Sequence, residues 1–377
     1  MEGSRVSLFE QGAPVVPDAP RRRWPRSAVA GVWALVVALV ALLAMSFLPS
    51  PYVIERPGPV YNTLGEVTDA DGAEVPLISI SGAETYPTSG SLDLLTVQVV
   101  GSPERRLSWL DVGLAWFDPT RAVVPIETIY PTGQTTEQRS AENATLMVDS
   151  QQDATAAALQ HLGYDVDPQL EISEVSAGGA AEGALEAGDI VLAADDQPVT
   201  RLTDLRRIIN AGDGAPVSFL VDRDGTERTV EVTPTEGEGG VWQVGISLLT
   251  VYDFPFDVEI ELNNVGGPSA GMMFALGMID TLTPGELNGG AQVAGTGTIV
   301  ADGTVGPIGG IRQKLWGAVD AGADYFLAPD ANCDEVVGHV PPGLQVFSVS
   351  TLDDAVTALE TIADDGALED LPTCAAK

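Results

Sequence analysis

Lysine is almost absent from this chain, and one of its two lysines stands in a pattern that predicts a buried amine. Of 18 basic residues, only Lys314 and the last residue, Lys377, are lysines. In "IGGIRQKLWGAVDAGA" the apolar residues Ile311, Leu315 and Ala318 share one face of a predicted helix with the first of these lysines. Burial disfavours an ammonium ion and lowers its pKa, so a lysine on this face is a candidate general base. The alternative is a lysine whose stem packs on the core while its amine reaches water.

A serine in a glycine-rich turn could supply the nucleophile that such a base activates. In "NNVGGPSAGMMFALGMID", Gly267 and Pro268 precede Ser269, and an apolar, helix-favouring run follows. Because Pro268 fits the first turn of a helix, we expect Ser269 at a helix N-terminus. Backbone N–H groups from Gly267 to Ser269 would then favour a developing oxyanion. Taken alone, a serine at such a position is more commonly a helix cap.

Taken together, the two stretches resemble the catalytic core of the Lon-type Ser/Lys peptidases. "GGPSAG" is followed by "GGIRQK", and "GTGTIVADGTVGPIGGI" lies between them. The resemblance implies that Ser269 is the nucleophile, that Lys314 is the base and later the acid, and that Thr296 orients the pair. The chain departs from the family pattern at Thr298 and Gly266, where Lon enzymes commonly carry acidic residues.

Residues 160–235 resemble a PDZ domain of the bacterial periplasmic type. The resemblance rests on "GGAAEGALEAGDIVLAADDQPV", in which a small-residue helix is expected before Leu185, and on "LTDLRRIIN", with "DRDGTE" as a hairpin turn. PDZ domains bind a peptide as an added strand and hold its terminal carboxylate with loop amides. By this resemblance the loop is Leu162, Gly163 and Tyr164.

The predicted fold class is α+β, a Lon-type proteolytic domain with an inserted PDZ-like domain, preceded by one transmembrane helix. Strand-like alternation occurs before the PDZ unit, in "VPLISISG" and "GSLDLLTVQVVG", and after it, in "VWQVGISLL" and "FDVEIEL". The Pro- and Gly-rich segment 49–65 is expected to be extended and turning. The predicted parts are a cytoplasmic tail (1–27), a transmembrane helix (28–48), the N-terminal part of the peptidase domain (62–140), the PDZ domain (160–235), the catalytic part of the peptidase domain (241–362) and a C-terminal tail (363–377).

Residues 28–48 form an uncharged run that is long enough to cross a bilayer as a helix. Four arginines between positions 21 and 26 precede it. The positive-inside rule therefore predicts a cytoplasmic N-terminus and an extracytoplasmic catalytic part, with the lipid bilayer contacted through 28–48. The alternative is a cleaved signal peptide, whose apolar region is normally shorter.

Charge and residue usage argue against several classes of partner. A net charge of −36 would repel nucleic acid. The two histidines, His161 and His339, are predicted to be structural, and the absence of a His/Cys cluster predicts no metal site and no cofactor. The two cysteines, Cys333 and Cys374, could form a disulfide in an oxidising compartment or stay free.

These features predict a membrane-anchored, ATP-independent serine endopeptidase that acts on exported proteins or peptides. With lysine only at 314 and 377, the chain contains no Gly-Lys-Ser/Thr phosphate loop. Two alternatives are an inactive PDZ adaptor that binds peptides without cutting them and a protease that cleaves only itself. The Lon resemblance also implies a possible homo-oligomer, although like-charged subunits repel unless salt screens them.

Overall fold

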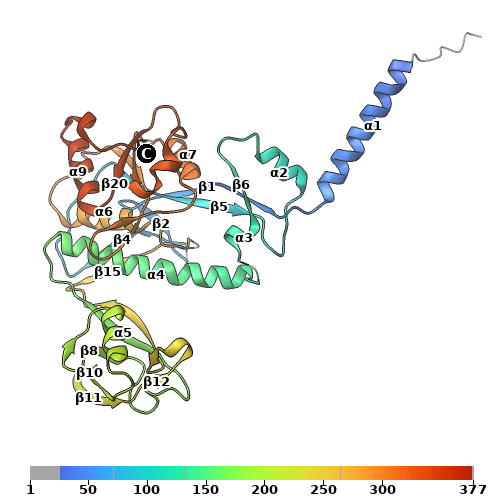
Figure 1. Cartoon of the computed structure of the whole chain (residues 1–377). Helices are drawn as coiled ribbons and strands as arrows, with labels where there is room; N and C mark the ends of the chain where they lie inside the picture. The colour runs from blue at the N-terminus through green and yellow to red at the C-terminus, as the bar shows by residue number, and fades with distance from the viewer. Residues whose placement is uncertain (1–25, 71, 132, 264, 376–377) are drawn as a thin grey trace, which may run out of the picture.

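The computed structural model describes residues 26–70, 72–131, 133–263 and 265–375. They form an N-terminal helix, α1 (Arg26–Phe47), a mixed α/β body, and a smaller lobe below the body (Figure 1). The helix matches the predicted transmembrane segment within two residues and is long and apolar enough to be a candidate span. The predicted cytoplasmic tail lies almost entirely outside the described residues.

The body is built on a six-stranded sheet to which both halves of the chain contribute. Its strand order is β20-β19-β16-β5-β1-β6. Strand β5 pairs antiparallel with β1 and parallel with β16, while the separate pair β4/β15 also joins the two halves. The lobe between them is therefore an insertion in the chain of the body. The strands are β1 (Tyr52–Asn62), β4 (Ile78–Ser81), β5 (Ser91–Val100), β6 (Ala122–Pro125), β15 (Asp257–Ile260), β16 (Gln292–Gly295), β19 (Tyr325–Pro329) and β20 (Gln345–Val349).

The segment after α1 is a strand of this sheet, whereas the sequence predicted an extended, turning connection. Strand β1 includes Pro57 and Pro59, and its register against β5 shifts between Pro57 and Val60. Such a bulge lets a strand contain prolines, which cannot donate ladder hydrogen bonds. Glycine is needed at position 58, since a Cβ there would lie 2.3 Å from Oγ1 of Thr96.

Helices cover both faces of the sheet. Helices α4, α6 and α9 pack together on one face, and α7 packs against β1 and β5 on the other. Helix α6 is buried on nearly every side, since its residues are apolar apart from Asp280 and Thr281 in its last turn. The helices are α2 (Trp109–Ala115), α3 (Ile126–Ile129), α4 (Thr136–His161), α6 (Gly271–Leu282), α7 (Ile311–Ala321), α8 (Cys333–Val336) and α9 (Leu352–Ala363). Short elements complete the body: β2 (Glu66–Thr68), β3 (Glu74–Pro76), β17 (Thr298–Ile299), β18 (Val305–Gly306), η2 (Asp330–Asn332) and η3 (Leu368–Asp370).

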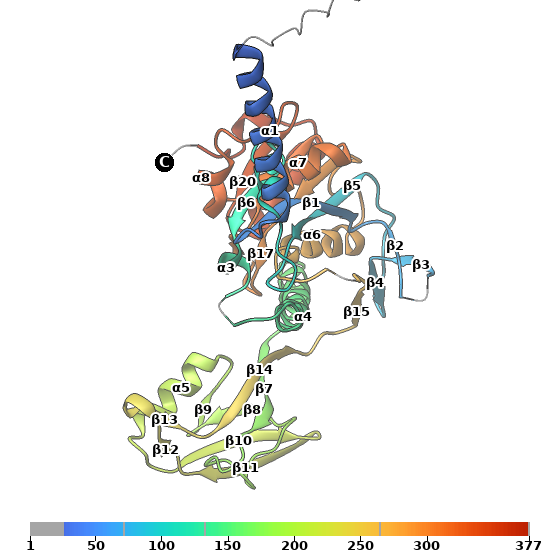
Figure 2. The same cartoon turned by 90° about the vertical axis from the view of Figure 1, so that its right-hand side faces the viewer.

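The lobe is a sheet of order β11-β10-β8-β7-β14 with helix α5 (Figure 2). Its hairpin turn is the predicted one, and Asp224 and Gly225 both have positive φ, as a type I′ turn requires. Two expectations were wrong. The residues before Leu185 form turns instead of a helix, and β14, expected in the peptidase part, pairs with β7 of the lobe. The elements are β7 (Pro168–Val175), β8 (Ile190–Ala194), β9 (Gln197–Pro198), α5 (Leu202–Ala211), β10 (Val217–Arg223), β11 (Thr226–Val232), β12 (Thr235–Glu236), η1 (Glu238–Gly240), β13 (Trp242–Gln243) and β14 (Ile246–Tyr252).

The Gly-Asp turn of the lobe holds a buried ion pair. Asp189 is fully buried and accepts two hydrogen bonds from the Arg223 guanidinium, at 2.6 and 2.7 Å. Burial by itself would raise the pKa of Asp189, but the hydrogen bonds from Arg223 and from the backbone of Glu186 outweigh it and lower that pKa. The aspartate therefore stays ionised and ties the turn to β10.

The predicted C-terminal tail is fixed to the body. Cys333 and Cys374 form a disulfide, which resolves the alternative left open by the sequence. The backbone N–H of Ser348 in β20 donates to the carbonyl of Pro372 at 2.8 Å.

Candidate active site

Three side chains that the sequence selected lie together in the body. The Nζ of Lys314 is 2.8 Å from the Oγ of Ser269 and 2.8 Å from the Oγ1 of Thr296. They come from α7, from the turn before α6, and from the residue that follows β16. Both interatomic distances are within hydrogen-bonding range, so proton transfer between the amine and the serine hydroxyl needs no rearrangement.

Helix α7 places the amine inside the protein. It begins after Gly310, whose φ of 69° is left-handed and whose added Cβ would lie 2.8 Å from the Val97 side chain. The helix begins at Ile311, as predicted, and Lys314 on its inner face is only 2% exposed. Burial lowers the pKa of Lys314 from an ordinary 10.5 to about 7. The alternative of an amine that reaches water is therefore wrong.

The Thr296 hydroxyl determines which hydrogen bonds the amine can make. Thr296 donates to the carbonyl of Ser269 at 2.9 Å, so its oxygen can only accept from Lys314. An uncharged lysine that donates to Thr296 directs its lone pair elsewhere, and the Ser269 hydroxyl is its other polar neighbour. With one N–H donated to Thr296, a neutral amine keeps its second N–H and its lone pair, so its contact with the Ser269 hydroxyl is compatible with either direction of hydrogen bonding.

The turn that carries the serine differs from the predicted helix start. Helix α6 begins at Gly271, so Pro268 and Ser269 precede its first turn instead of forming it. The N–H of Gly267 donates to the carbonyl of Asn143 at 2.9 Å, and proline has no N–H. Of the three backbone groups predicted to bind an oxyanion, only the Ser269 N–H has no recorded acceptor among the described residues.

Helix α4 holds this turn in place. Besides the bond from Gly267 to Asn143, the Ser150 hydroxyl donates to the carbonyl of Pro268 at 3.1 Å. A Cβ at Gly266 would lie 2.7 Å from the Cβ of Asn143. The close approach of α4 explains physically why glycine occupies the position where an acidic residue was expected from the resemblance.

A cavity of about 260 Å³ opens beside the serine. On one side it is bounded by β5, whose pairing with β16 ends at Leu94. From Leu95 onward, no strand among the described residues pairs with that edge of β5. The cavity is lined by Ser269 and Gly267 together with Pro59, Tyr61, Thr96, Val97 and Gln98. An extended peptide could therefore pair with this edge next to the hydroxyl.

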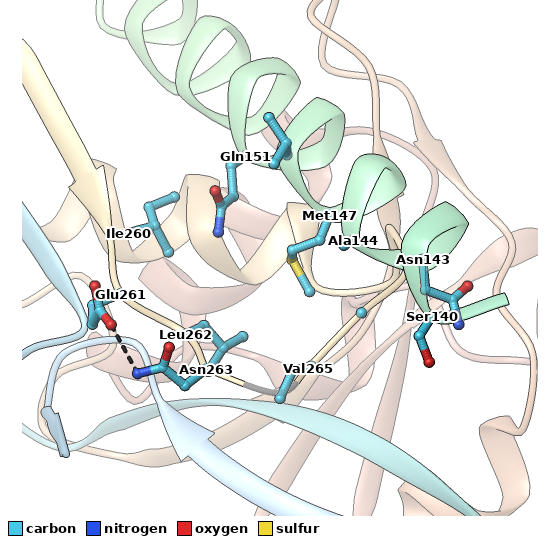
Figure 3. Close-up of a pocket in the computed structure, with 12 residues that line it drawn as sticks. Ser140, Asn143, Ala144, Met147, Gln151, Ile260, Glu261, Leu262, Asn263 and Val265 are labelled. Atoms are coloured by element: carbon cyan, nitrogen blue, oxygen red, sulfur yellow. Dashed lines mark hydrogen bonds between the residues drawn. The ribbon is translucent and has the colours of Figure 1, made fainter. Parts of the chain in front are cut away.

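A second cavity, of about 660 Å³, adjoins the first and shares Met147, Val265 and Gly266 with it. It lies between the N-terminal half of α4 and the segment after β15, and Figure 3 shows Gln151 and Met147 facing Ile260, Leu262 and Val265 across it. Its wall is partly apolar and partly polar. The two cavities extend the space around the serine along α4.

The lobe has a separate groove between α5 and the edge strand β14. This cavity, of about 390 Å³, has an apolar floor that includes Leu205, Ile209 and Leu248, and Gly245 lies at the start of its edge strand. Gly245 was not singled out from the sequence, although a glycine before the alternating "ISLL" is a turn signal. The groove is open along β14, as strand addition requires.

The loop predicted to bind carboxylate lies elsewhere. Leu162 caps the end of α4 and packs on the core of the body, Gly163 follows it with a φ of 83°, and the Tyr164 ring packs edge-on against Phe256. These residues belong to the connection between the body and the lobe. They do not line the groove between α5 and β14, because β14 comes from the far end of the inserted segment.

The two histidines lie outside the candidate active site. His161 is the last residue of α4, and its ring lies 2.7 Å from Asp353 of α9. The His339 ring lies near the carbonyl of Val337. The residues that the structure describes contain no group of three or more His, Cys, Asp or Glu that could hold a metal.

Comparison with known proteins agrees with this architecture. Residues 264–361 match the Lon protease (S16) C-terminal proteolytic domain, and residues 146–233 match the PDZ domain family. The chain thus contains a Lon-type proteolytic domain and a PDZ domain, which together account for about half of its length.

The curated relatives are similar over a short stretch only. Lon protease 1 of Sorangium cellulosum is 38% identical over 93 residues, which is 24% of this chain and 11% of the relative. Lon protease of Geobacter metallireducens is 33% identical over 117 residues, 30% of this chain and 14% of the relative. The PDZ domain of the SdrC-like protein from Listeria monocytogenes is a solved structure with 18% identity and a TM-score of 0.20, covering 21% of this chain and 86% of that one.

Proposed function

We propose that this chain is a membrane-anchored, ATP-independent serine endopeptidase that uses a Ser269/Lys314 dyad. The observation that carries the proposal is the buried Lys314 amine, 2.8 Å from the Ser269 hydroxyl. Because the lysine pKa is about 7, a large fraction of the amine is neutral at physiological pH and can act as a base. Thr296 positions the amine through its hydrogen bond.

The dyad would cleave a peptide bond in two steps. The neutral Lys314 amine accepts the hydroxyl proton as Ser269 Oγ attacks the carbonyl carbon, and the Ser269 N–H is a candidate donor to the oxyanion. The ammonium then protonates the leaving amine as the C–N bond breaks, leaving an ester on Ser269. Water then attacks the ester carbonyl while Lys314 accepts its proton, and the ammonium returns this proton to Ser269 Oγ as the ester C–O bond breaks and the acid product leaves.

Substrates would enter as extended segments. The open edge of β5 beside Ser269 offers backbone hydrogen bonds to a strand, and the groove between α5 and β14 of the PDZ domain offers a second site for a peptide terminus. The chain has no Gly-Lys-Ser/Thr motif among its 377 residues, which supports activity without ATP on loops, termini or unfolded segments.

Helix α1 would anchor the enzyme, with the N-terminus in the cytoplasm and the catalytic part outside. Its 22 residues are predominantly apolar, with Arg26 as the one charged residue at its start, none of them is buried, and further arginines precede it. The strongly negative chain would not bind nucleic acid. Homo-oligomerisation stays a prediction, which light scattering of the protein in detergent would check.

The test incubates wild-type protein and Ser269→Ala with a peptide library and identifies new termini by mass spectrometry. We expect cleavage by the wild type only, with Lys314→Arg as inactive as Ser269→Ala because a guanidinium stays protonated. Peptide binding without cleavage by any of the three would support the adaptor. A cut in the enzyme itself, abolished by Ser269→Ala and without turnover of the library, would support self-cleavage.

A further inference from the structure

Helix α2 exposes an apolar face where a helix on a water-facing surface usually carries polar residues. Its inner side is formed by Val112 and Ala115, which are buried. On the outer side and just beyond the helix, Leu114 is 64% exposed, Trp116 63% and Phe117 90%. Clusters of exposed large apolar side chains mark interaction surfaces. The face therefore requires a partner of its own.

The position of α2 relative to α1 indicates which partner this is. The N–H of Trp109 donates to the carbonyl of Leu48 at 3.2 Å, and the N–H of Ser50 donates to the carbonyl of Leu107 at 2.7 Å. Helix α2 thus begins beside the inner end of α1, as Figure 1 shows. A helix of 22 residues is about 33 Å long and matches the hydrocarbon core, so Leu48 would lie at the membrane boundary.

The exposed side chains cannot lie far from that boundary. Helix α2 has seven residues and is therefore about 10 Å long. Its exposed tryptophan and phenylalanine are residue types that membrane interfaces favour, and Tyr52 and Trp109 form an edge-on aromatic pair at its start.

The charges near α2 also suit lipid headgroups. Arg105 and Arg106 are exposed, and neither forms an ion pair with another of the described residues. The carboxylates nearby are engaged in other contacts, since Glu104 accepts hydrogen bonds from Ser102 and Thr136, Asp111 caps α2, and Asp118 pairs with Arg121 at 2.8 Å. In a chain with a net charge of −36, an unpaired arginine doublet next to the anchor favours contact with lipid phosphates.

We propose that Leu114, Trp116 and Phe117, flanked by Arg105 and Arg106, form a membrane-lying surface, the α2 surface. It rests on the lipid headgroups and holds the peptidase body against the bilayer. The inference depends on the proposed anchoring by α1. A lipid surface is favoured over a second copy of the chain because the patch is continuous with α1 and combines aromatic with arginine side chains. Such contact would fix the orientation of the catalytic cleft relative to the membrane.

The test places the full chain in nanodiscs and attaches an environment-sensitive fluorophore to Phe117→Cys. The described cysteines are both in the disulfide, so the introduced thiol reacts selectively. Brominated lipids should quench this label at least roughly twofold more than a label on Thr226→Cys, whose strand β11 lies at the far end of the lobe (Figure 1). A Leu114→Ser/Trp116→Ser pair in the labelled protein should bring quenching down to the control level.

The possible results distinguish failure of the α2 surface from failure of the proposed membrane anchoring by α1. Failure of the chain to co-elute with nanodiscs would overturn the anchoring proposal. Co-elution without lipid quenching at position 117 would overturn the α2 surface alone. Self-quenching of the label that is the same with and without brominated lipids would instead show that these side chains contact a second copy of the chain. Arg105→Gln/Arg106→Gln should weaken quenching in phosphatidylglycerol but not in phosphatidylcholine discs.

Discussion

At the scale of single residues, the chemistry of the proposed site depends on the unfavourable burial of one lysine side chain. Lys314 is 2% exposed on a helix face that it shares with Ile311 and Leu315, and burial is the cause that lowers its pKa. Since one pKa unit corresponds to about 1.4 kcal/mol, keeping this lysine charged in the fold costs several kcal/mol. The protein gives up stability at the position where it would gain a base.

The first prediction concerns the pH dependence of catalysis. The base must be neutral, so kcat/KM should rise about tenfold per pH unit below pH 7 and level off above it, following the Lys314 pKa of about 7. Initial rates on a peptide identified by mass spectrometry, measured from pH 5 to 9, check this. A flat profile across pH 7 would exclude Lys314 as the base.

The second prediction is that Lys314→Met inactivates the protein but stabilises it. The pKa of Lys314 is about 7 in the folded protein and 10.5 ordinarily. Below pH 7 the amine is charged in both the folded and the unfolded state, so its burial lowers the free energy of unfolding of the wild type by the full amount. This destabilisation decreases as the pH rises toward 10.5. The gain in unfolding free energy should therefore be on the order of a few kcal/mol at pH 6 and smaller at pH 9.

Urea unfolding followed by tryptophan fluorescence measures both values. Arg312→Met is the matched control, because Arg312 is exposed on the same helix. If both variants gained the same free energy of unfolding, or if the gain of Lys314→Met did not change with pH, burial of the charged amine would not be the cause.

At the scale of elements, α4 matters because it joins the two domains and also restrains the serine turn. Its Asn143 and Ser150 hold the backbone of Gly267 and Pro268, and its last turn leads into the PDZ domain. No local pattern in the sequence indicates the contact between this helix and the turn, because the contacting residues lie more than 100 positions apart.

The third prediction concerns this contact. Gly266→Ala places a carbon 2.7 Å from the Cβ of Asn143, so the turn must move, and activity should fall about 10- to 100-fold because a displacement of about 1 Å at a reacting group is enough. The control is Gly309→Ala, whose added carbon meets no heavy atom within 4 Å. Comparison of kcat/KM for both variants tests the idea, and unchanged activity in Gly266→Ala would show that the turn tolerates the shift.

The fourth prediction concerns the disulfide that fixes the C-terminal segment. Cys333 and Cys374 close a loop of 41 residues, so replacing both by serine should lower the free energy of unfolding by up to about 4 kcal/mol. Denaturant titration of the double variant beside the wild type, with and without reductant, measures the loss. Wild type and variant should become equal under reducing conditions, and a remaining gap would point to side-chain packing as the cause.

At the scale of the whole molecule, the PDZ domain and the peptidase body are connected by β14 as well as by α4. Tyr252, the last residue of β14, donates a hydrogen bond to Asp153 of α4 at 2.8 Å, and its ring stacks on Phe254. Burial raises the pKa of Asp153, and the bond from Tyr252 opposes that rise. The strand that borders the PDZ groove is thus tied directly to the helix that restrains the serine turn.

The fifth prediction follows from this tie. Tyr252→Phe keeps the ring but removes the hydroxyl, so the junction should lose about 1 kcal/mol of local stability. Hydrogen exchange should increase in residues 250–260 and at the C-terminal half of α4, while exchange in α7 stays unchanged. If hydrogen exchange in these segments were the same in Tyr252→Phe as in the wild type, the hydrogen bond would not stabilise the junction.

Local sequence patterns were enough to predict the apolar helix α1, the apolar face of α7 that carries Lys314 and the hairpin turn of the PDZ domain, whereas Thr296 was selected only by the resemblance to the Lon-type peptidases. Side-chain periodicity and turn chemistry are properties of neighbouring residues, so they can be read along the chain. Only the tertiary structure decided that β14 completes the PDZ sheet, that Gly267 gives its N–H to α4 and that the disulfide forms. Each of these depends on which distant segments meet, and that is determined by packing of the whole fold instead of by local propensity.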